Sequence, residues 1–198
     1  DVQWSEVPGR DEVWKEQTIK NTSEAQFKVE FECEFLGSVD TLIAPSKLRT
    51  LVYEKPIQQN AGLDVYEGVR QGHDYIMTVD VARGVGGDYS AFTVIDISKF
   101  PHKMVAKYRD NEIKPMLFPN VILDVAKGYN NAWLLIEVND IGEQVANILH
   151  YDLEYENMLM AAMRGRAGQV VGHGFSGKKS QMGVRMTAAV KKLGCSNL

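Results

Sequence analysis

The alternation of apolar and polar positions predicts three consecutive strands in the middle of the chain. Runs rich in β-branched and aromatic residues cover 75–81, 91–97 and 104–108, and a glycine-rich turn at 83–88 joins the first two. Connections as short as these can join antiparallel strands but not parallel ones. We therefore expect an antiparallel meander.

Helical and strand periodicity alternate in the second half of the chain. Helical spacing covers 117–129 and 141–153, whereas 132–138 has the unbroken apolar character of a buried strand and 158–163 that of a short strand. A last helix is predicted over 178–193. Three meander strands followed by this αβαβα order predict an α/β fold with helices on the faces of a mixed sheet.

The N-terminal segment is predicted to be mainly helical. Residues 23–26 have the Ser-x-x-Gln form of a capping box, and Phe27, Phe31 and Phe35 follow at four-residue spacing. Little sequence precedes this aromatic face to cover it, so we expect residues 1–52 to be the C-terminal remnant of a larger domain.

Apolar periodicity is lost between residues 53 and 72. Proline, glutamine, asparagine and three glycines punctuate this stretch, as they do in linkers and surface crossovers. We place the domain boundary there, so a second domain occupies residues 73–198.

Composition excludes several classes of protein. With 44% hydrophobic and 24% charged residues the chain is an ordinary globular one. It has no apolar run near the roughly 20 residues of a membrane span and no export signal at its start. Cys33 and Cys195 lack metal-binding spacing, which favours a reducing compartment. The absence of an initiator Met indicates a fragment.

The net charge of −4 conceals a basic C-terminal block. From residue 160 onward the chain has seven Lys and Arg and no Asp or Glu. Such a block is typical of a polyanion-binding surface, although a solvated helix face gives the same pattern.

A glycine-rich stretch within this block, 164–179, predicts a loop that follows a phosphate backbone, because glycine permits close approach and cations replace counterions. Residues 172–178 also fit the G-x-x-x-x-G-K spacing of a nucleotide-binding loop, but Lys179 stands where that loop needs Ser or Thr. We expect no nucleotide site there. The residues assigned to DNA binding are Arg164, Arg166, Lys178, Lys179 and Arg185.

Two acids interrupt otherwise apolar strand runs, Asp80 in the first strand and Glu137 in the fourth. A buried carboxylate needs a partner, a metal ion or a place at the open end of the sheet. If the two strands are adjacent and parallel, both carboxylates converge, and a divalent cation relieves their repulsion. Hard oxygen ligands suit Mg²⁺ or Mn²⁺. For each acid alone, a surface carboxylate that binds loop amides is the alternative.

Other candidate residues have weaker patterns. Asp88 follows the glycine turn and is predicted to fold back near Asp80 as a third or outer ligand, although Asp is also an ordinary turn residue. Asp140 is predicted to cap the following helix. Asp96 ends the second strand and should lie far from Asp80. The four histidines are interpreted as structural or surface residues.

The ordered set of segments 78–84, 87–92 and 135–139 resembles the nuclease domain of the large terminase subunit of tailed bacteriophages. Segments 152–156 and 194–198 are similar to the myovirus-type members. More faintly, residues 23–43 resemble the end of that family's ATPase domain.

This resemblance implies a ribonuclease H-like, metal-dependent endonuclease that cuts concatemeric double-stranded viral DNA by two-metal hydrolysis in the cytoplasm of the infected bacterial host. Its implied partners are the procapsid portal protein and the small terminase subunit. Asp80 and Glu137 match the first two catalytic acids, and Asp88 matches an auxiliary acid. The family's third acid lies on its last helix and would fall beyond Leu198. The ATPase motifs are absent from the printed sequence, so we attribute no ATP hydrolysis to it.

Two other interpretations remain open. A Holliday-junction resolvase or another ribonuclease H-like nuclease would share the fold and differ in its substrate. A catalytically inert DNA-binding module of a packaging motor would bind DNA without cutting it.

Overall fold

The computed structural model describes residues 4–31, 50, 52–162, 169–173 and 180–196. The chain separates into two compact units, Asp1–Tyr53 and Glu54–Leu198. Within the described ranges, no helix is both long and apolar enough to cross a membrane.

The N-terminal unit contains a 3-10 turn, η1 (Trp4–Glu6), and two helices, α1 (Glu12–Asn21) and α2 (Glu24–Glu30). Ser23 caps α2 by accepting a hydrogen bond from the Gln26 amide at 3.1 Å, so the predicted helix start is confirmed. The end predicted for this helix, including Phe35, lies outside the described residues.

An aromatic cluster forms the interior of this unit. Phe27 is buried, and its ring centroid lies 5.7 Å from that of Trp4 and 5.9 Å from that of Trp14. Phe31 packs edge-on against Trp14. Our expectation that little upstream sequence could cover this aromatic face is therefore wrong, because η1 and α1 supply two tryptophans.

The second unit is built on a six-stranded sheet of order β1-β2-β5-β4-β3-β6. All neighbours are antiparallel except β3 and β6, which are parallel. The predicted meander is confirmed as β3-β4-β5. The strands are β1 (Gln58–Asn60), β2 (Leu63–Val65), β3 (Tyr75–Asp80), β4 (Ser90–Asp96), β5 (Lys103–Asp110) and β6 (Trp133–Ile136).

The linker predicted over 53–72 contains two of these strands. β1 and β2 form a hairpin, and β2 pairs with β5 through Leu63 and Tyr108. Gly62 adopts a φ of +85°, and a Cβ there would lie 2.6 Å from the Arg109 carbonyl oxygen. Part of this segment therefore belongs to the sheet, because Gly62 serves a hairpin turn that packs closely on β5.

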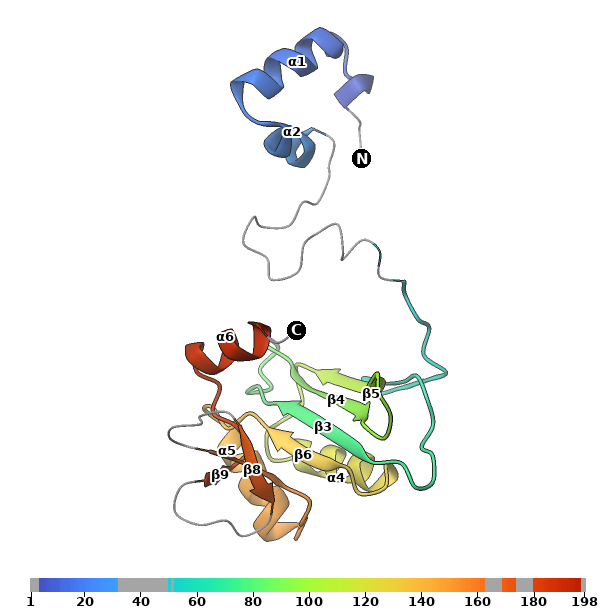
Figure 1. Cartoon of the computed structure of the whole chain (residues 1–198), viewed down its shortest axis with the longest axis vertical. Coiled ribbons are helices and arrows are strands. Elements are labelled where there is room, and N and C mark those ends of the chain that lie inside the picture. The colour runs from blue at the N-terminus through green and yellow to red at the C-terminus, as the bar shows by residue number, and fades with distance from the viewer. Residues whose placement is uncertain (1–3, 32–49, 51, 163–168, 174–179, 197–198) are drawn as a thin grey trace. The chain divides into compact units, whose positions relative to one another are not determined.

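Helices α4 (Phe118–Gly128) and α5 (Gly142–Asn147) pack on one face of this sheet (Figure 1). A π-helical turn, η2 (Ile148–Asp152), continues α5, so the helix predicted over 141–153 is confirmed with a change of winding. Alternate residues of β3 are buried against these helices, and the others face the opposite, partly exposed side. The buried core includes Met77, Val79, Val94, Leu134, Ile136, Phe118, Ile122, Val145 and Leu149.

A small second sheet follows, of order β8-β7-β9. Its strands are β7 (Leu159–Ala162), β8 (Val170–His173) and β9 (Ser180–Met182), and helix α6 (Ala188–Ser196) comes after them. The strand predicted over 158–163 is confirmed as β7.

Two predictions for this region are corrected. The loop predicted over 164–179 includes β8, and the helix predicted over 178–193 begins only at Ala188. In both cases the backbone groups pair with β7. A strand three or four residues long is specified by its partner more than by its own periodicity.

Candidate metal-binding site

The parallel pairing of β3 with β6 brings Asp80 and Glu137 side by side. Val79 is in register with Ile136, and the Glu137 amide donates a hydrogen bond to the Val79 carbonyl oxygen at 2.8 Å. Side chains alternate along a strand, so both acids lie on the sheet face opposite the buried Val79 and Ile136. The two strands are thus adjacent and parallel, as the predicted convergence of the acids required.

The backbone around Glu137 is fixed from two further directions. The Val184 amide donates to the Ile136 carbonyl oxygen at 2.8 Å, and the Val138 amide donates to the Val184 carbonyl oxygen at 2.9 Å. Gly142 lies against the Glu137 carbonyl, and a Cβ at that position would be 1.9 Å from the oxygen. Only glycine fits there without a backbone shift.

Asp80 and Glu137 line a hollow of about 250 Å³, together with residues of β4 and with Val184 and Met186. This is several times the roughly 30 Å³ of one water molecule, so a hydrated ion fits. Within the described part of the chain, neither carboxylate makes a hydrogen bond or an ion pair.

The electrostatics of the hollow favour a bound cation. Burial raises the pKa of Glu137, the charge of Asp80 raises it further, and the ammonium group of Lys191 on α6 acts in the opposite direction. Two like charges held close together disfavour ionisation unless a positive charge joins them.

Asp88 lies in a neighbouring cleft of about 500 Å³ that Asp80, Arg83, Tyr89 and Asp140 also line. Asp88 therefore folds back to the Asp80 end of the sheet. Glu137 does not line this cleft, and no three Asp, Glu, His or Cys residues of the described ranges form a group able to hold a metal ion. The structure brings together Asp80 with Glu137 and Asp80 with Asp88, but not all three.

Asp140 does not cap α5, contrary to prediction. Its φ is +48°, whereas a capping residue takes an extended conformation. Instead its carboxylate accepts hydrogen bonds at 2.8–3.0 Å from the guanidinium group of Arg83. This exposed pair links the β3–β4 turn to the β6–α5 connection beside the acids.

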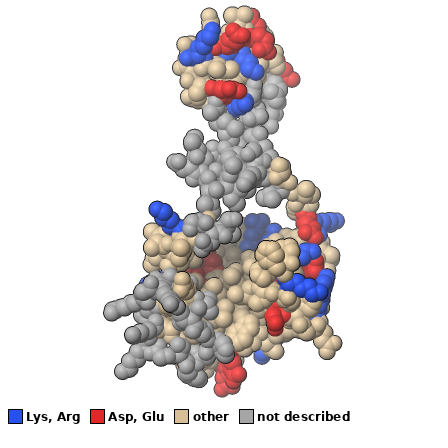
Figure 2. Space-filling model, in the orientation of Figure 1, with Lys and Arg blue, Asp and Glu red and all other residues tan. Residues whose placement is uncertain are grey.

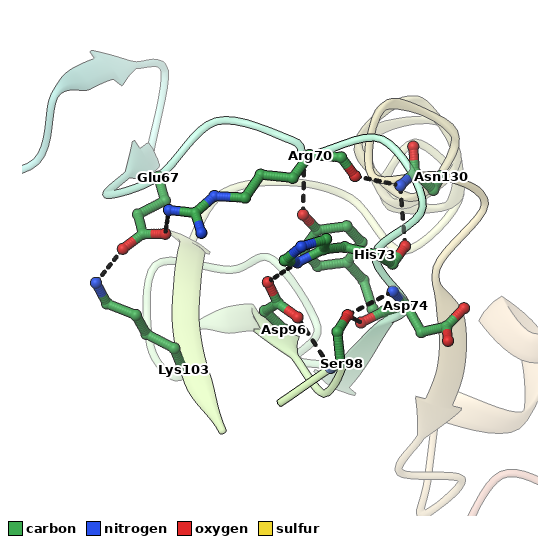
Figure 3. A network of polar contacts seen from close by, with 9 residues as sticks. Glu67, Arg70, His73, Asp74, Asp96, Ser98, Lys103 and Asn130 are labelled. Carbon is green, nitrogen blue, oxygen red and sulfur yellow. Dashed lines mark hydrogen bonds and ion pairs between the residues drawn. The ribbon is translucent and has the colours of Figure 1, made fainter. Parts of the chain in front are cut away.

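The opposite end of the sheet holds a polar network around Asp96 (Figure 3). Asp96 pairs with Tyr75 at the start of β3, so it lies far from Asp80 as predicted. Its carboxylate meets His73 Nδ1 at 2.6 Å and accepts from the Ser98 amide at 3.0 Å. Burial raises the pKa of Asp96, but hydrogen bonds from His73 and Ser98 prevail and lower it to about 2.

Of the predicted DNA-binding residues, Arg164, Arg166, Lys178 and Lys179 lie outside the described residues. Arg185 is described and exposed, between two residues that line the acidic hollow. Figure 2 shows acidic side chains recessed on this face, with basic side chains on both sides.

Sequence reasoning did not single out Arg83, Tyr89 or Arg109, all of which lie near the acids. The signal for Arg109 was available, since strand alternation and meander pairing place it on the same sheet face as Asp80.

Comparison with known families agrees with this geometry. Residues 77–196, well over half of the chain, match the family described as "Terminase RNaseH-like domain". The chain belongs to this family. The match includes the second half of β3, all of β6 and α6, and therefore both strand-borne acids.

Solved structures similar to this terminase domain are large terminase nucleases of thermophilic phages. The magnesium-bound nuclease of phage G20c is 16% identical, with a TM-score of 0.51, over 72% of this chain and 60% of that one. Its cobalt-bound form is 18% identical, with a TM-score of 0.49 and the same coverage. The nuclease domain from Thermus phage P74-26 is 22% identical, with a TM-score of 0.36, over 40% of each chain.

These comparisons establish the ribonuclease H-like α/β fold. The chain spans only about 60% of the length of the G20c nuclease structures.

Proposed function

We propose that this chain carries the nuclease centre of a phage large terminase subunit, a metal-dependent endonuclease that cuts concatemeric double-stranded viral DNA. The observation that carries the proposal is the pair of carboxylates, Asp80 and Glu137, at the ends of two adjacent parallel strands. Neither makes a hydrogen bond or ion pair within the described residues. Family membership and the magnesium bound to the similar G20c nuclease support it.

The donor set fits a hard divalent cation. Asp80 and Glu137 offer only carboxylate oxygens, which suit Mg²⁺ and Mn²⁺. We propose that Asp88, which lines the adjoining cleft with Asp80, acts as a third or outer ligand. Such an ion, when bound, lowers the pKa of an attacking water and stabilises charge on the scissile phosphate.

The protein's own contribution is to position these groups. Hydrogen bonds to Val79 and Val184 fix the strand end that carries Glu137, so that Glu137 and Asp80 line one hollow on the same face of the sheet. Two ions require more ligands than these two acids supply. We propose that the complete centre takes a further carboxylate.

The wider assignment is also a proposal. Residues 73–198 would be the nuclease domain and 1–52 the end of an ATPase domain, joined through 53–72. The expected partners are viral DNA, the portal protein and the small terminase subunit, and the expected location is the cytoplasm of the infected host cell.

Plasmid nicking in Mg²⁺, Mn²⁺ or EDTA tests the proposal directly. The complete nuclease, which includes the further carboxylate, should nick only when a metal ion is present. Glu137→Gln should abolish nicking and weaken Mn²⁺ binding measured by calorimetry, yet leave DNA binding nearly normal. Asp124→Asn, which removes an exposed carboxylate from α4, is the matched control and should behave as wild type.

The outcome also separates the alternatives. Nicking that survives Glu137→Gln at a near wild-type rate contradicts the assignment. A chain that binds DNA but neither Mn²⁺ nor Mg²⁺ is the inert module. Faster cleavage of four-way junctions or RNA–DNA hybrids than of linear duplex indicates another ribonuclease H-like nuclease.

A further inference from the structure

Arg109 lies in the same row of the sheet as Asp80. Asp80 pairs with Ala91, and Ala91 pairs with Arg109, so the three residues run across β3, β4 and β5. Directly opposed residues share a sheet face. Neighbouring strands are about 4.8 Å apart, so Arg109 lies about 10 Å from Asp80 across the open face.

The guanidinium group of Arg109 stacks on an exposed tyrosine. Its central carbon lies 5.4 Å from the ring centroid of Tyr89, a residue that is itself 48% exposed. No carboxylate in the described ranges pairs with Arg109. The adjacent Asp110 is occupied, because it accepts hydrogen bonds from the amides of Glu112 and Ile113.

Lys107, two residues earlier on the same face, differs from Arg109. Its ammonium group lies 3.5 Å from a carboxylate oxygen of Asp64 and 5.6 Å from the ring centroid of Tyr66. Lys107 therefore has a carboxylate partner within the sheet, whereas Arg109 is exposed and pairs with no carboxylate of the described residues.

The position of Tyr89 ties this pair to the acidic centre. Tyr89 lines the cleft that contains Asp80 and Asp88. A phosphate group is repelled close to these carboxylates, so an anionic ligand that crosses this face needs its cationic contact some distance away. Arg109, two strands away from Asp80 on the same sheet face, provides this cationic contact.

We propose that the Arg109–Tyr89 pair binds a backbone phosphate of duplex DNA, close to but distinct from the phosphate at the acids. The stacked ring holds the planar guanidinium, whose edge donors can bind phosphate in bidentate fashion. This contact rests on the proposed function only in taking DNA as the ligand.

Salt-dependent binding of the full chain to a 20-base-pair duplex in EDTA tests the contact. Loss of one phosphate contact lowers the slope of log K against log salt by about 0.9. Arg109→Gln should show this decrease, and Arg109→Lys should retain the slope with a weaker affinity. Tyr89→Leu should weaken binding without changing the slope, because the charge remains.

Lys127→Gln is the control, since it removes an exposed positive charge from the last turn of α4 and should leave the slope unchanged. An unchanged slope in Arg109→Gln overturns the proposal, as does an equal change in Lys127→Gln or the absence of duplex binding by the wild-type chain. Thermal unfolding of each variant confirms that it is folded.

Nicking and binding measured together distinguish failure of the proposed function from failure of the Arg109 contact. A complete nuclease, with the further carboxylate present, that never nicks DNA but shows the Arg109-specific slope change refutes the proposed function and keeps the contact. A chain that nicks DNA with equal slopes in wild type and Arg109→Gln keeps the nuclease and refutes the contact.

Discussion

Each end of the β3–β4 pair carries an aspartate, and the two carboxylates differ in whether other groups hydrogen-bond to them. Asp96, at one end, is held by His73 at 2.6 Å and by the Ser98 amide at 3.0 Å. Asp80, at the other end, makes no such contact within the described residues and lies beside a second acid, Glu137. The fold satisfies the Asp96 carboxylate with hydrogen bonds, and we propose that the Asp80 carboxylate binds a metal ion.

This difference separates structural acids from functional ones. A carboxylate with its hydrogen bonds made stabilises the folded state, because its ionised form is favoured there. A pair of carboxylates held together without a cation stores repulsion, which a ligand can relieve. If the proposed function holds, aspartate has a structural role at one end of the sheet and a chemical role at the other.

The largest expected effect contrasts the two ends in catalysis. Asp80→Asn should lower the nicking rate by at least about 10³-fold, since losing a metal ligand removes several kcal/mol of transition-state stabilisation. Asp96→Asn should change the rate by less than about threefold, measured at a temperature where both variants are folded. Equal losses in the two variants would remove the contrast.

Next in size is the effect of a methyl group behind Glu137. Gly142→Ala places a Cβ against the Glu137 carbonyl oxygen and should lower the free energy of unfolding by about 2–3 kcal/mol. Gly128→Ala is the matched control, because nothing lies within 4 Å of a Cβ there. Urea denaturation measures both, and similar values for the two variants would show that the acidic end of the sheet is not tightly built.

A third prediction concerns the pH dependence of stability at the satisfied end. The pKa of Asp96 falls from 3.8 to about 2 on folding, so its stabilisation is complete above about pH 4 and is lost as the pH falls toward 2. Asp96→Asn should cost about 2 kcal/mol of unfolding free energy at pH 7. The difference from wild type should shrink as the pH is lowered through this range.

Asp80→Asn supplies the comparison for that experiment. Its stability at pH 7 should equal or exceed that of wild type, because the substitution removes a charge beside Glu137. A loss as large as that of Asp96→Asn would mean that Asp80 also has a structural partner.

The smallest expected effect is at the exposed Arg83–Asp140 pair. Arg83→Gln should change the free energy of unfolding by less than about 1 kcal/mol, because solvent screens exposed ion pairs. Urea denaturation at low and high salt provides the measurement. A larger loss, or one that salt does not diminish, would show that this pair holds the β3–β4 turn in place.

The sequence was informative where one strand's own pattern decides the structure. Asp80 and Glu137 could be found because each interrupts an apolar run, and Asp96 could be separated from them by strand direction. The sequence analysis posed the adjacent, parallel pairing of these two strands as a condition for the acids to meet, and the structure meets that condition in β3 and β6.

What could not be predicted depends on partners distant in sequence. Ser180–Met182 is a strand because β7 lies beside it. Asp140 meets Arg83 because its φ is positive, a conformation that the neighbouring residues do not predict. Trp4 and Trp14 cover the aromatic face of α2 through a tertiary contact. Gly62 belongs to a hairpin, although its composition is equally typical of a linker.

Because Val184 hydrogen-bonds to the end of β6, we expect the proposed centre to assemble late in synthesis. Residue 184 is synthesised 47 residues after Glu137. The growing polypeptide therefore contains both acids before the segment around Val184 can pack beside them. We expect the growing chain to be unable to cut nucleic acid until this late stretch has docked, which delays any cleavage until translation has passed this point.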